Sequence, residues 1–451
     1  MPPRGLGKKE GKKLMEKFFK MGERGSSVGT EIRAGLTTFL AMAYIIAVNP
    51  ALLMDAGIAP AAAVTSTCLG AGIMTILMGL FANRPVACAS GMGINAILAY
   101  TLVGMTGGDW HAAMAVIFVE GIAILVLVLC GLREAIMDAI PVSLRHAISV
   151  GLGLFIAMIG LADGGVIVAN ESTMVALGNV SDPKFIVGLV SIVASIILYA
   201  MNVKGSLLWG ILIAVVAGIP LGVTQIPTGV VSFLDFSSFG APFQSDASGV
   251  MGIAKVVTTP TLLVFAFSLM MSDFFDTMGT AMAIGKQGKF LNEDGTVENI
   301  KEILTVDSAA AAVGGFIGAS SITTFVESAS GAADGGRTGL SSIMAGALFI
   351  VASFFSPLIT MISSAATCGA LVVVGFLMMG DVVDIDWTDL LQGFPAFMIV
   401  AGIPLTYSIS NGIGMGFICY VLVAIVTGQV KKVKPLMWVA ALAFLVYFLI
   451  V

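Results

Sequence analysis

The feature that most constrains this chain is a succession of long apolar runs from residue 32 to the C-terminus. Most of these runs are close to the ~20 residues that a helix needs to cross a bilayer. They are continuous and do not alternate with polar residues, which excludes a transmembrane β-barrel. Charged residues make up 11% of the 451 residues, against about 25% in soluble domains. The sequence therefore predicts an all-α polytopic membrane protein.

Hydropathy and charge together predict the number and direction of the spans. The N-terminal tail is basic and lacks an apolar core with a cleavage site, so it is not a signal peptide. With the N-terminus in the cytoplasm, all but two of the 22 Lys and Arg residues lie inside, as the positive-inside rule requires, and only Lys184 and Lys255 lie outside. We expect a multi-pass protein of the cytoplasmic (inner) membrane with spans at 32–54, 60–82, 86–104, 111–132, 142–161, 184–203, 205–224, 260–284, 303–319, 320–336, 338–355, 358–380, 391–408 and 410–428. A last apolar run, 435–451, either spans the membrane or lies at its interface.

The long polar segment between the seventh and eighth predicted spans suggests an internal repeat. It divides the fourteen expected spans into seven and seven. An odd number of spans per half makes the second half inverted in the membrane relative to the first. Many secondary transporters have this 7+7 type of inverted repeat and bind substrate near the midplane, where the repeats meet.

The third and tenth predicted spans occupy equivalent positions in the two halves, and both look interrupted. They read RPVACASGMGINAILAYTLV and GASSITTFVESASGAADGGR. Unpaired backbone groups are prohibitive in lipid, so we expect the extended pieces Val86–Ser90 and Ser320–Phe325 to pair as short antiparallel strands. Each strand would lead into a half-helix that begins at Asn95 or Glu327, with its positive end toward a cavity. Either segment alone is more typical of close helix packing through small residues than of a site. Two such segments at matching repeat positions, each with a polar side chain after the extended piece, favour a site.

Acidic residues inside predicted spans point to a transport function. Asp273 and Asp276 lie in the apolar span 260–284, and Glu327 lies in the tenth span. A charge at the bilayer centre costs about 2.5–3.5 kcal/mol or more, and no Lys or Arg in these spans offsets it. A single Asp is explained by a hydrogen bond to a neighbouring helix. Three acids suggest that at least one is protonated at rest and couples transport to protons.

Other functional classes find little support. No GxxxxGK[ST] motif is present, which disfavours ATP-driven transport, and the charge pattern lacks a nucleic-acid footprint. The five cysteines are scattered without CxxC spacing, and we expect them to be packing residues. His111 and His146 are lone residues at loop edges, where an interfacial role is expected. We expect no enzymatic activity, no metal and no cofactor.

Four motifs in order along nearly the whole chain resemble a known family. They are AMAYIIAVNPALL (41–53), GMGINAILAYTLV (91–103), SDFFDTMGT (272–280) and SSITTFVESASGAADGGRTGL (320–340). They resemble the AzgA-like purine permeases of the nucleobase–cation symporter group. The resemblance implies proton symport of adenine, guanine or hypoxanthine, and a core domain that moves against a gate domain.

The resemblance also implies a domain layout and a site. The expected divisions are a cytoplasmic tail, core, gate, extracytoplasmic loop, core, gate and C-terminal segment, at 1–31, 32–132, 133–224, 225–259, 260–355, 356–428 and 429–451. The family's span-eight acid falls on Asp273, its span-ten acid on Glu327 and its span-three amide on Asn95. We expect apolar walls for the purine from Phe274, Phe325 and Tyr44, and further polar contacts from Ser90 and Thr324. Proton coupling is assigned to Glu327, Asp273 and Asp276.

Several alternatives stay open at this stage. An anion transporter of sulfate-like substrates would share the architecture, as would a uracil or xanthine permease. An aspartyl protease of the membrane would need a GxGD motif, and the nearest text, Met378–Asp381, lacks it. A channel would not accumulate substrate. The Gly- and Ala-rich gate surface suggests a homodimer, although a lipid-facing gate looks the same.

Overall fold

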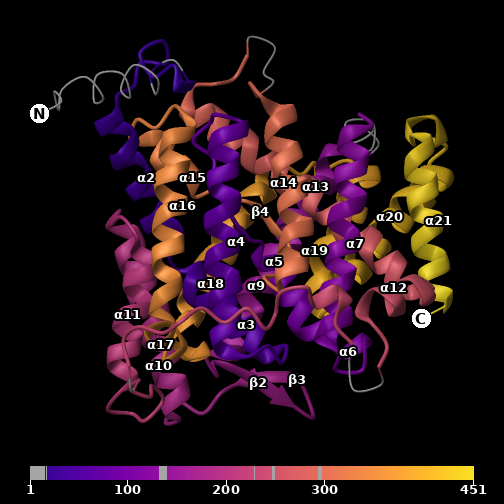
Figure 1. Ribbon diagram of the computed structural model, residues 1–451. Coiled ribbons are helices and arrows are strands. Elements are labelled where there is room, and N and C mark those ends of the chain that lie inside the picture. The colour runs from indigo at the N-terminus through magenta and orange to yellow at the C-terminus, as the bar shows by residue number, and fades with distance from the viewer. Residues whose placement is uncertain are drawn as a thin grey trace, which may run out of the picture.

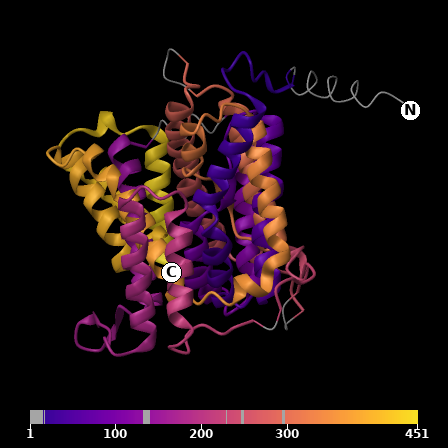
Figure 2. The same ribbon diagram turned by 90° about the vertical axis from the view of Figure 1, so that its left-hand side faces the viewer.

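The computed structural model describes residues 16, 18–131, 140–227, 229–245, 249–292 and 297–450. Most of the described chain is helical, and long helices run side by side between two ends of the molecule (Figures 1 and 2). Within the described residues, seven helices are long and apolar enough to cross a membrane, or eight with the pair α12–α13, which bends by 98°. Shorter apolar helices accompany them. The chain is thus a helical, multi-pass membrane protein.

In the first half of the chain, most helices lie at the sequence positions of the predicted spans. Its elements are α2 (Val28–Met42), α3 (Ile45–Asp55), α4 (Pro60–Phe81), β1 (Cys88–Ser90), α5 (Met92–Ile97), the π-helical turn η1 (Leu98–Leu102), α6 (Val103–Met105), α7 (Trp110–Leu129), α9 (Val142–Asp163), β2 (Ile167–Asn170), β3 (Met174–Leu177), α10 (Pro183–Ala200) and α11 (Ser206–Gly218). The first predicted span is two helices, which meet at Ala43 and Tyr44. Most of the predicted tail 1–31 lies outside the described residues.

The second half likewise contains long helices together with short helices and a strand. It contains η2 (Ala241–Phe243), α12 (Gly252–Thr258), α13 (Pro260–Gly288), α14 (Ile300–Ile317), β4 (Ile322–Thr324), α15 (Ser328–Ala333), α16 (Gly339–Ala352), η3 (Ser353–Phe355), α17 (Ser356–Thr360), α18 (Ser364–Met378), η4 (Met379–Asp384), α19 (Leu390–Leu405), α20 (Ile409–Val426), η5 (Val430–Lys432) and α21 (Pro435–Ile450). The run 435–451, left undecided from the sequence, forms the helix α21 beside α20. The total of fourteen spans stays a prediction.

A hairpin at one end of the molecule was not expected from the sequence. Strands β2 and β3 pair antiparallel, with Ile167 opposite Leu177. The turn is closed by Asn170, whose side-chain oxygen accepts hydrogen bonds from the backbone N–H groups of Ser172 (2.9 Å) and Thr173 (3.0 Å). Asn commonly organises tight turns in this way. The two strands have only four residues each and are mostly exposed, so their sequence carries no clear strand pattern beside the long apolar helices.

The helices pack as two groups, which we call the first bundle and the second bundle. The first bundle comprises α2–α7 and α13–α16 with the strands β1 and β4, and the second comprises α9–α11 and α18–α21. Small residues let helix backbones approach closely inside each bundle. In the first bundle α4 meets α16 at Gly79 and Gly339, and in the second α9 meets α18 at Gly153 and Gly375. Neither crossing has room for a Cβ atom.

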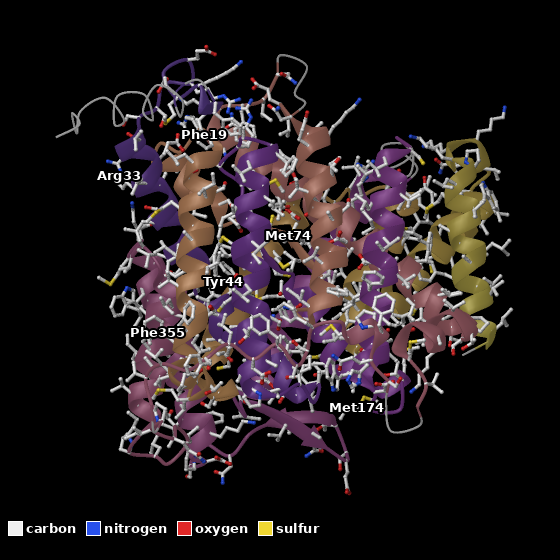
Figure 3. The ribbon with its side chains drawn as sticks, in the orientation of Figure 1. Phe19, Arg33, Tyr44, Met74, Met174 and Phe355 are labelled. Carbon is white, nitrogen blue, oxygen red and sulfur yellow. The ribbon has the colours of Figure 1, made fainter. Side chains whose placement is uncertain are left out.

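Three labelled side chains give the direction along the helices (Figure 3). Arg33 lies toward the end at which the N-terminus is found, and Met174 lies at the opposite end. Tyr44 lies between them and is fully buried. We refer to these two ends as the N-terminal face and the hairpin face.

Candidate functional site

The two interrupted segments cross each other as the sequence predicted. Strands β1 and β4 pair antiparallel, with Cys88 opposite Thr324 and Ser90 opposite Ile322. Backbone hydrogen bonds continue the pairing beyond both ends of the ladder, from Phe325 N–H to Ala87 and from Gly91 N–H to Ser321. The strands have three residues each and are shorter than the extended pieces expected from the sequence. All six residues are buried, so the crossing satisfies backbone groups that lipid could not.

Strand β1 is held to α4 by a neutral side chain. The hydroxyl of Thr75 accepts a hydrogen bond from the backbone N–H of Cys88 and donates one to its carbonyl, both at 2.9 Å. The hydroxyl of Ser328, in α15, accepts from the N–H of Ala87 at 3.0 Å. Residues from both halves of the chain therefore fix the start of β1.

Strand β4 is held to α14 by a carboxylate. Asp307 is fully buried, and it accepts hydrogen bonds from the backbone N–H of Thr324 (2.9 Å) and from the hydroxyls of Thr323 (3.0 Å) and Thr277 (2.7 Å). Thr277 belongs to α13, so this one carboxylate joins α13, α14 and β4. The sequence analysis missed Asp307.

Asp307 could have been found by the criterion used for Asp273 and Asp276, an acidic residue inside an apolar span. Asp307 is the only acid in the apolar run 303–319, just as Glu120 is the only acid in the run 111–132. Glu120, in α7, is also fully buried. An acid inside a membrane span is a functional candidate by default because of its cost in lipid. Both residues met that criterion.

Glu327 and Tyr44, two of the predicted site residues, lie in contact. Glu327 stands at the N-cap position of α15. Its Oε1 accepts a hydrogen bond of 2.6 Å from the hydroxyl of Tyr44, which lies at the bend between α2 and α3. The hydroxyl fixes the direction of the carboxylate, and the buried ring of Tyr44 forms an apolar wall beside it. Phe325, two residues before Glu327, is also buried.

Asn95 is buried but is not at the start of its half-helix. It is the fourth residue of α5, which begins at Met92 because the chain turns into the helix directly after Gly91. The helix then continues through η1 to Met105, so this half-helix is longer than α15. Within the part of the chain that the structure describes, neither the amide nitrogen nor the amide oxygen of Asn95 has a hydrogen-bond partner. A buried polar group left in this state costs about 1–3 kcal/mol.

The remaining predicted site residues take different positions. Asp273 is buried in α13, one turn before Thr277. Thr324 has a buried hydroxyl oxygen without a partner in the described residues. Ser90 donates its hydroxyl proton to the carbonyl of Ala319 at 2.6 Å, so it braces the crossing. The side chains of Phe274 and Asp276 lie outside the described residues.

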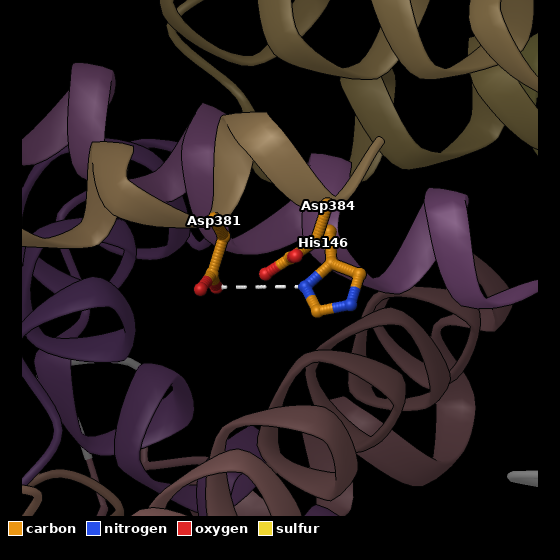
Figure 4. Close-up of side chains that lie close together, drawn as sticks. All are labelled: His146, Asp381 and Asp384. Carbon is orange, nitrogen blue, oxygen red and sulfur yellow. Dashed lines mark ion pairs between the residues drawn. The ribbon is translucent and has the colours of Figure 1, made fainter. Parts of the chain in front are cut away.

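The two histidines are not lone residues, which corrects the sequence analysis. His146 of α9 lies beside Asp381 and Asp384 of η4, with Nδ1 3.9 Å from an oxygen of Asp381 (Figure 4). The two chain segments are far apart in sequence, so the spacing of residues gave no sign of this cluster. One nitrogen of His146 and one oxygen from each of the two acids lie within 4.8 Å of one another. Two of these three side chains, His146 and Asp381, already contact each other as an ion pair.

His111 lies in a second cluster of charged groups. Asp109 caps α7 and contacts both His111 (3.1 Å) and Lys255 of α12 (2.8 Å). Burial favours the neutral acid, but the hydrogen bonds from Lys255 and His111 outweigh it and lower the pKa of Asp109. The cluster ties α12 to the start of α7.

Interrupted membrane segments that meet inside a multi-pass bundle are typical of membrane transport proteins. The sequence comparison agrees: residues 29–415 match the permease family, and the chain belongs to that family. It is 38% identical to a putative permease of Methanocaldococcus jannaschii, over 97% of this chain and 98% of the relative. It is 37% identical to the adenine permease AdeP of Escherichia coli, over 96% of each chain. It is also 37% identical to the guanine/hypoxanthine permease PbuO of Bacillus subtilis, over 95% of this chain and 99% of the relative.

Solved structures of low sequence identity share the fold. The transmembrane domain of the cyanobacterial bicarbonate transporter BicA superposes with a TM-score of 0.59 at 16% identity, covering 87% of this chain and 97% of that domain. The structure of SLC26A9 gives a TM-score of 0.63 at 10% identity, covering 87% of this chain and 65% of that chain. At these identities the likeness concerns the fold alone.

Proposed function

We propose that this permease imports purine nucleobases across the cytoplasmic membrane together with protons. The observation that carries the proposal is the chemistry at the strand crossing: an oriented carboxylate, Glu327, and a buried amide, Asn95, whose polar atoms have no partner among the described residues. Relatives that match nearly the full length of the chain are named as adenine and guanine/hypoxanthine permeases. No catalytic step is part of the proposal.

A purine suits these groups better than an anion does. The carboxylate of Glu327 accepts hydrogen bonds from ring N–H or exocyclic amino groups, and the amide of Asn95 both donates and accepts. The rings of Tyr44 and Phe325 offer apolar faces to a flat heterocycle. An anion would meet the buried acid Asp273 and the partly buried acid Glu327, although a bicarbonate transporter shares the fold. A uracil or xanthine permease is the nearer alternative, because the same groups complement those bases.

Proton coupling follows from the cost of burying acids. An ionised Asp273 or Glu327 is stabilised when its cavity is open to water and destabilised when the cavity closes. A proton taken up on one side and released on the other removes that cost during the transition. Asp276 was assigned to the same role from the sequence and stays part of the proposal.

The pattern of helix packing supports a 7+7 inverted repeat. If span n of the first half corresponds to span n+7, then α4 against α16 should be mirrored by α14 against α7. Both pairs pack closely. The pair α10–α11 is mirrored in the same way by α19–α20, and β1 pairs with its own counterpart β4. We therefore assign the first bundle to the core domain and the second bundle to the gate domain.

Transport would then proceed by movement of the core against the gate. The core carries the strand crossing, so its movement would expose the site alternately to each side, as in other inverted-repeat transporters. We place the N-terminal face in the cytoplasm on the charge distribution. A homodimer would form through the gate domain, which leaves the core free to move.

Uptake by proteoliposomes tests the proposal. Radiolabelled adenine, guanine, hypoxanthine and uracil are supplied with and without an inward proton gradient. We expect saturable accumulation of one or more purines that collapses when the gradient is dissipated, and no competition by sulfate. Accumulation that persists without a proton gradient would remove proton coupling. Sulfate competition would favour the anion transporter, and transport of uracil alone would favour the pyrimidine permease.

A further inference from the structure

The two bundles touch at both ends of the molecule, and the contacts differ in charge. Toward the N-terminal face, Lys204 from the loop between α10 and α11 reaches Asp334, which directly follows α15 in the first bundle. The ammonium lies 3.1 Å from a carboxylate oxygen of Asp334, and Arg33 lies 3.4 Å from the same oxygen. Opposite charges hold this contact together, so it forms without any change in protonation near neutral pH.

At the hairpin face the two bundles meet through like charges. Asp55 ends α3 and Tyr100 lies in η1, both in the first bundle, whereas Asp163 ends α9 in the second. The hydroxyl oxygen of Tyr100 is 2.8 Å from an oxygen of Asp55 and 3.4 Å from an oxygen of Asp163. One hydroxyl therefore stands between two carboxyl groups from opposite bundles. All three side chains are partly exposed, so protons can reach them from solvent.

Counting protons shows what this contact requires. A phenol has one proton to donate and two lone pairs to accept. If both acids are ionised, the single proton serves Asp55, and Asp163 faces the phenol oxygen at 3.4 Å without a good donor. If one acid is protonated, Asp163 donates to Tyr100 and Tyr100 donates to Asp55. The same proton removes the repulsion between the two carboxylates.

The other groups around Asp163 do not change this balance when the bundles separate. Lys184 at the start of α10 attracts Asp163, and Tyr407 and Cys368 also lie close enough to interact with it. All three belong to the second bundle, as Asp163 does, and they stay beside it. Tyr407 and Cys368 are neutral in the range of pH considered. Only Asp55 and Tyr100 are brought to Asp163 by closure.

We propose that Asp55, Tyr100 and Asp163 form a proton-dependent latch between the two bundles at the hairpin face. Closure of this face binds a proton, whereas closure of the N-terminal face through Lys204 and Asp334 does not. Acidic solvent on the hairpin side therefore favours the state that is closed on that side. The inference rests on the proposed function only in assuming that the bundles move.

A distance measurement in the absence of substrate tests the latch. Nitroxide labels are placed at Met105→Cys in the first bundle and Val180→Cys in the second, both exposed near the hairpin face. Cys130 and Cys419 are replaced by Ala, because the other free cysteines are buried. Pulsed electron resonance then gives the ratio of short to long distances between pH 5 and 8. We expect the ratio to rise as the pH falls, by up to about tenfold per pH unit in the transition.

Variants separate the latch from other acids. In Asp163→Asn the amide donates to Tyr100 at every pH, so the short distance should dominate without pH dependence. Tyr100→Phe should lower the short-distance population throughout. The matched control Lys204→Ala should shift the ratio but keep its pH dependence. The series is repeated with Glu327→Gln to remove the buried acid at the strand crossing.

The latch is overturned by a wild-type ratio that is constant from pH 5 to 8, or by wild-type pH dependence in Asp163→Asn. These outcomes are independent of substrate. A protein with the expected latch but no nucleobase uptake would leave the latch standing and end the proposed function. Nucleobase uptake by a protein whose ratio of short to long distances does not change with pH would support the proposed function and end the latch.

Discussion

The two crossing segments share a backbone plan but differ in charge. Strand β1 is fixed by the hydroxyl of Thr75 and leads to the amide of Asn95. Strand β4 is fixed by the carboxylate of Asp307 and leads to the carboxylate of Glu327. The two segments thus have similar frames, and the ionisable side chains beside the strands, Asp307 and Glu327, belong to the second segment and its neighbouring helix. Similar backbone frames need not carry the same chemistry: in the proposed function both segments recognise the nucleobase, whereas the acid next to the crossing, Glu327, belongs to the second segment alone.

The largest expected effect comes from the anchors of the two strands. Asp307→Ala removes the acceptor for three hydrogen bonds in a fully buried position. Hydrogen bonds to a charged group contribute about 1.5–3 kcal/mol each, against about 1 kcal/mol for neutral ones. We expect Asp307→Ala to lower stability by ~3 kcal/mol or more and to abolish transport.

Thermal unfolding of the purified protein in detergent provides the measurement. The matched control is Thr75→Ala, which removes the α4 side chain that anchors the other strand, β1. Thr75→Ala should cost only ~1–2 kcal/mol, since its two bonds are neutral. Equal losses of stability in the two variants would contradict the difference in charge between the anchors. Asp307→Asn, which retains an acceptor oxygen, should recover part of the loss.

The second effect concerns Glu327, at the start of α15. Glu327→Gln keeps the size of the side chain and an acceptor for the hydroxyl of Tyr44 but cannot exchange a proton. We expect accumulation against a gradient to fall at least tenfold, while membrane insertion and unfolding temperature stay close to the wild type. Counterflow exchange of nucleobase, which needs no net proton transfer, should persist. Normal accumulation in this variant would exclude Glu327 from proton coupling.

How much of this site was visible in the sequence can be judged from the same residues. The breaks in the third and tenth spans and the pairing of β1 with β4 follow from one rule, that lipid does not tolerate unpaired backbone groups. The hydrogen bond from Tyr44 to Glu327 was not predicted, because the sequence analysis treated Tyr44 only as an apolar wall. Strand lengths and the place of Asn95 inside α5 were not predictable, because caps and first turns depend on local geometry within a few residues.

Other features depended on contacts between distant segments. Asp307 is a lone acid in predicted span nine and was missed, and nothing in the sequence shows that it contacts Thr277 and β4. His146 was misjudged because Asp381 and Asp384 lie far from it in sequence, on a different helix. The contacts at both ends of the bundles also join distant residues: Lys204 and Asp334 are 130 positions apart, and Tyr100 lies 45 and 63 positions from Asp55 and Asp163. Such pairings require the packing of the helices to be known.

A third effect should separate recognition from coupling. Asn95→Ala removes the donor NH2 and the acceptor oxygen of a buried amide. The loss of hydrogen bonds to a ligand should weaken nucleobase binding about tenfold, from ~1–1.5 kcal/mol. Dependence of uptake on the proton gradient should remain. Binding is measured by titration calorimetry, and uptake by the proteoliposome assay. Loss of proton dependence in Asn95→Ala would show that coupling is shared between the halves.

The smallest effect is expected where one hydroxyl links the two functions. Tyr44→Phe keeps the buried aromatic wall and removes only the 2.6 Å hydrogen bond to Glu327. The carboxylate is then no longer held in one direction, so nucleobase affinity should fall about three- to tenfold, while the protein still accumulates substrate in a proton gradient. Tyr44→Ala is the contrasting variant, because it also removes the wall and should lose further affinity. If Tyr44→Phe abolished accumulation as fully as Glu327→Gln, the hydroxyl would belong to the proton path, and the division between a recognising half and a coupling half would have to include α3.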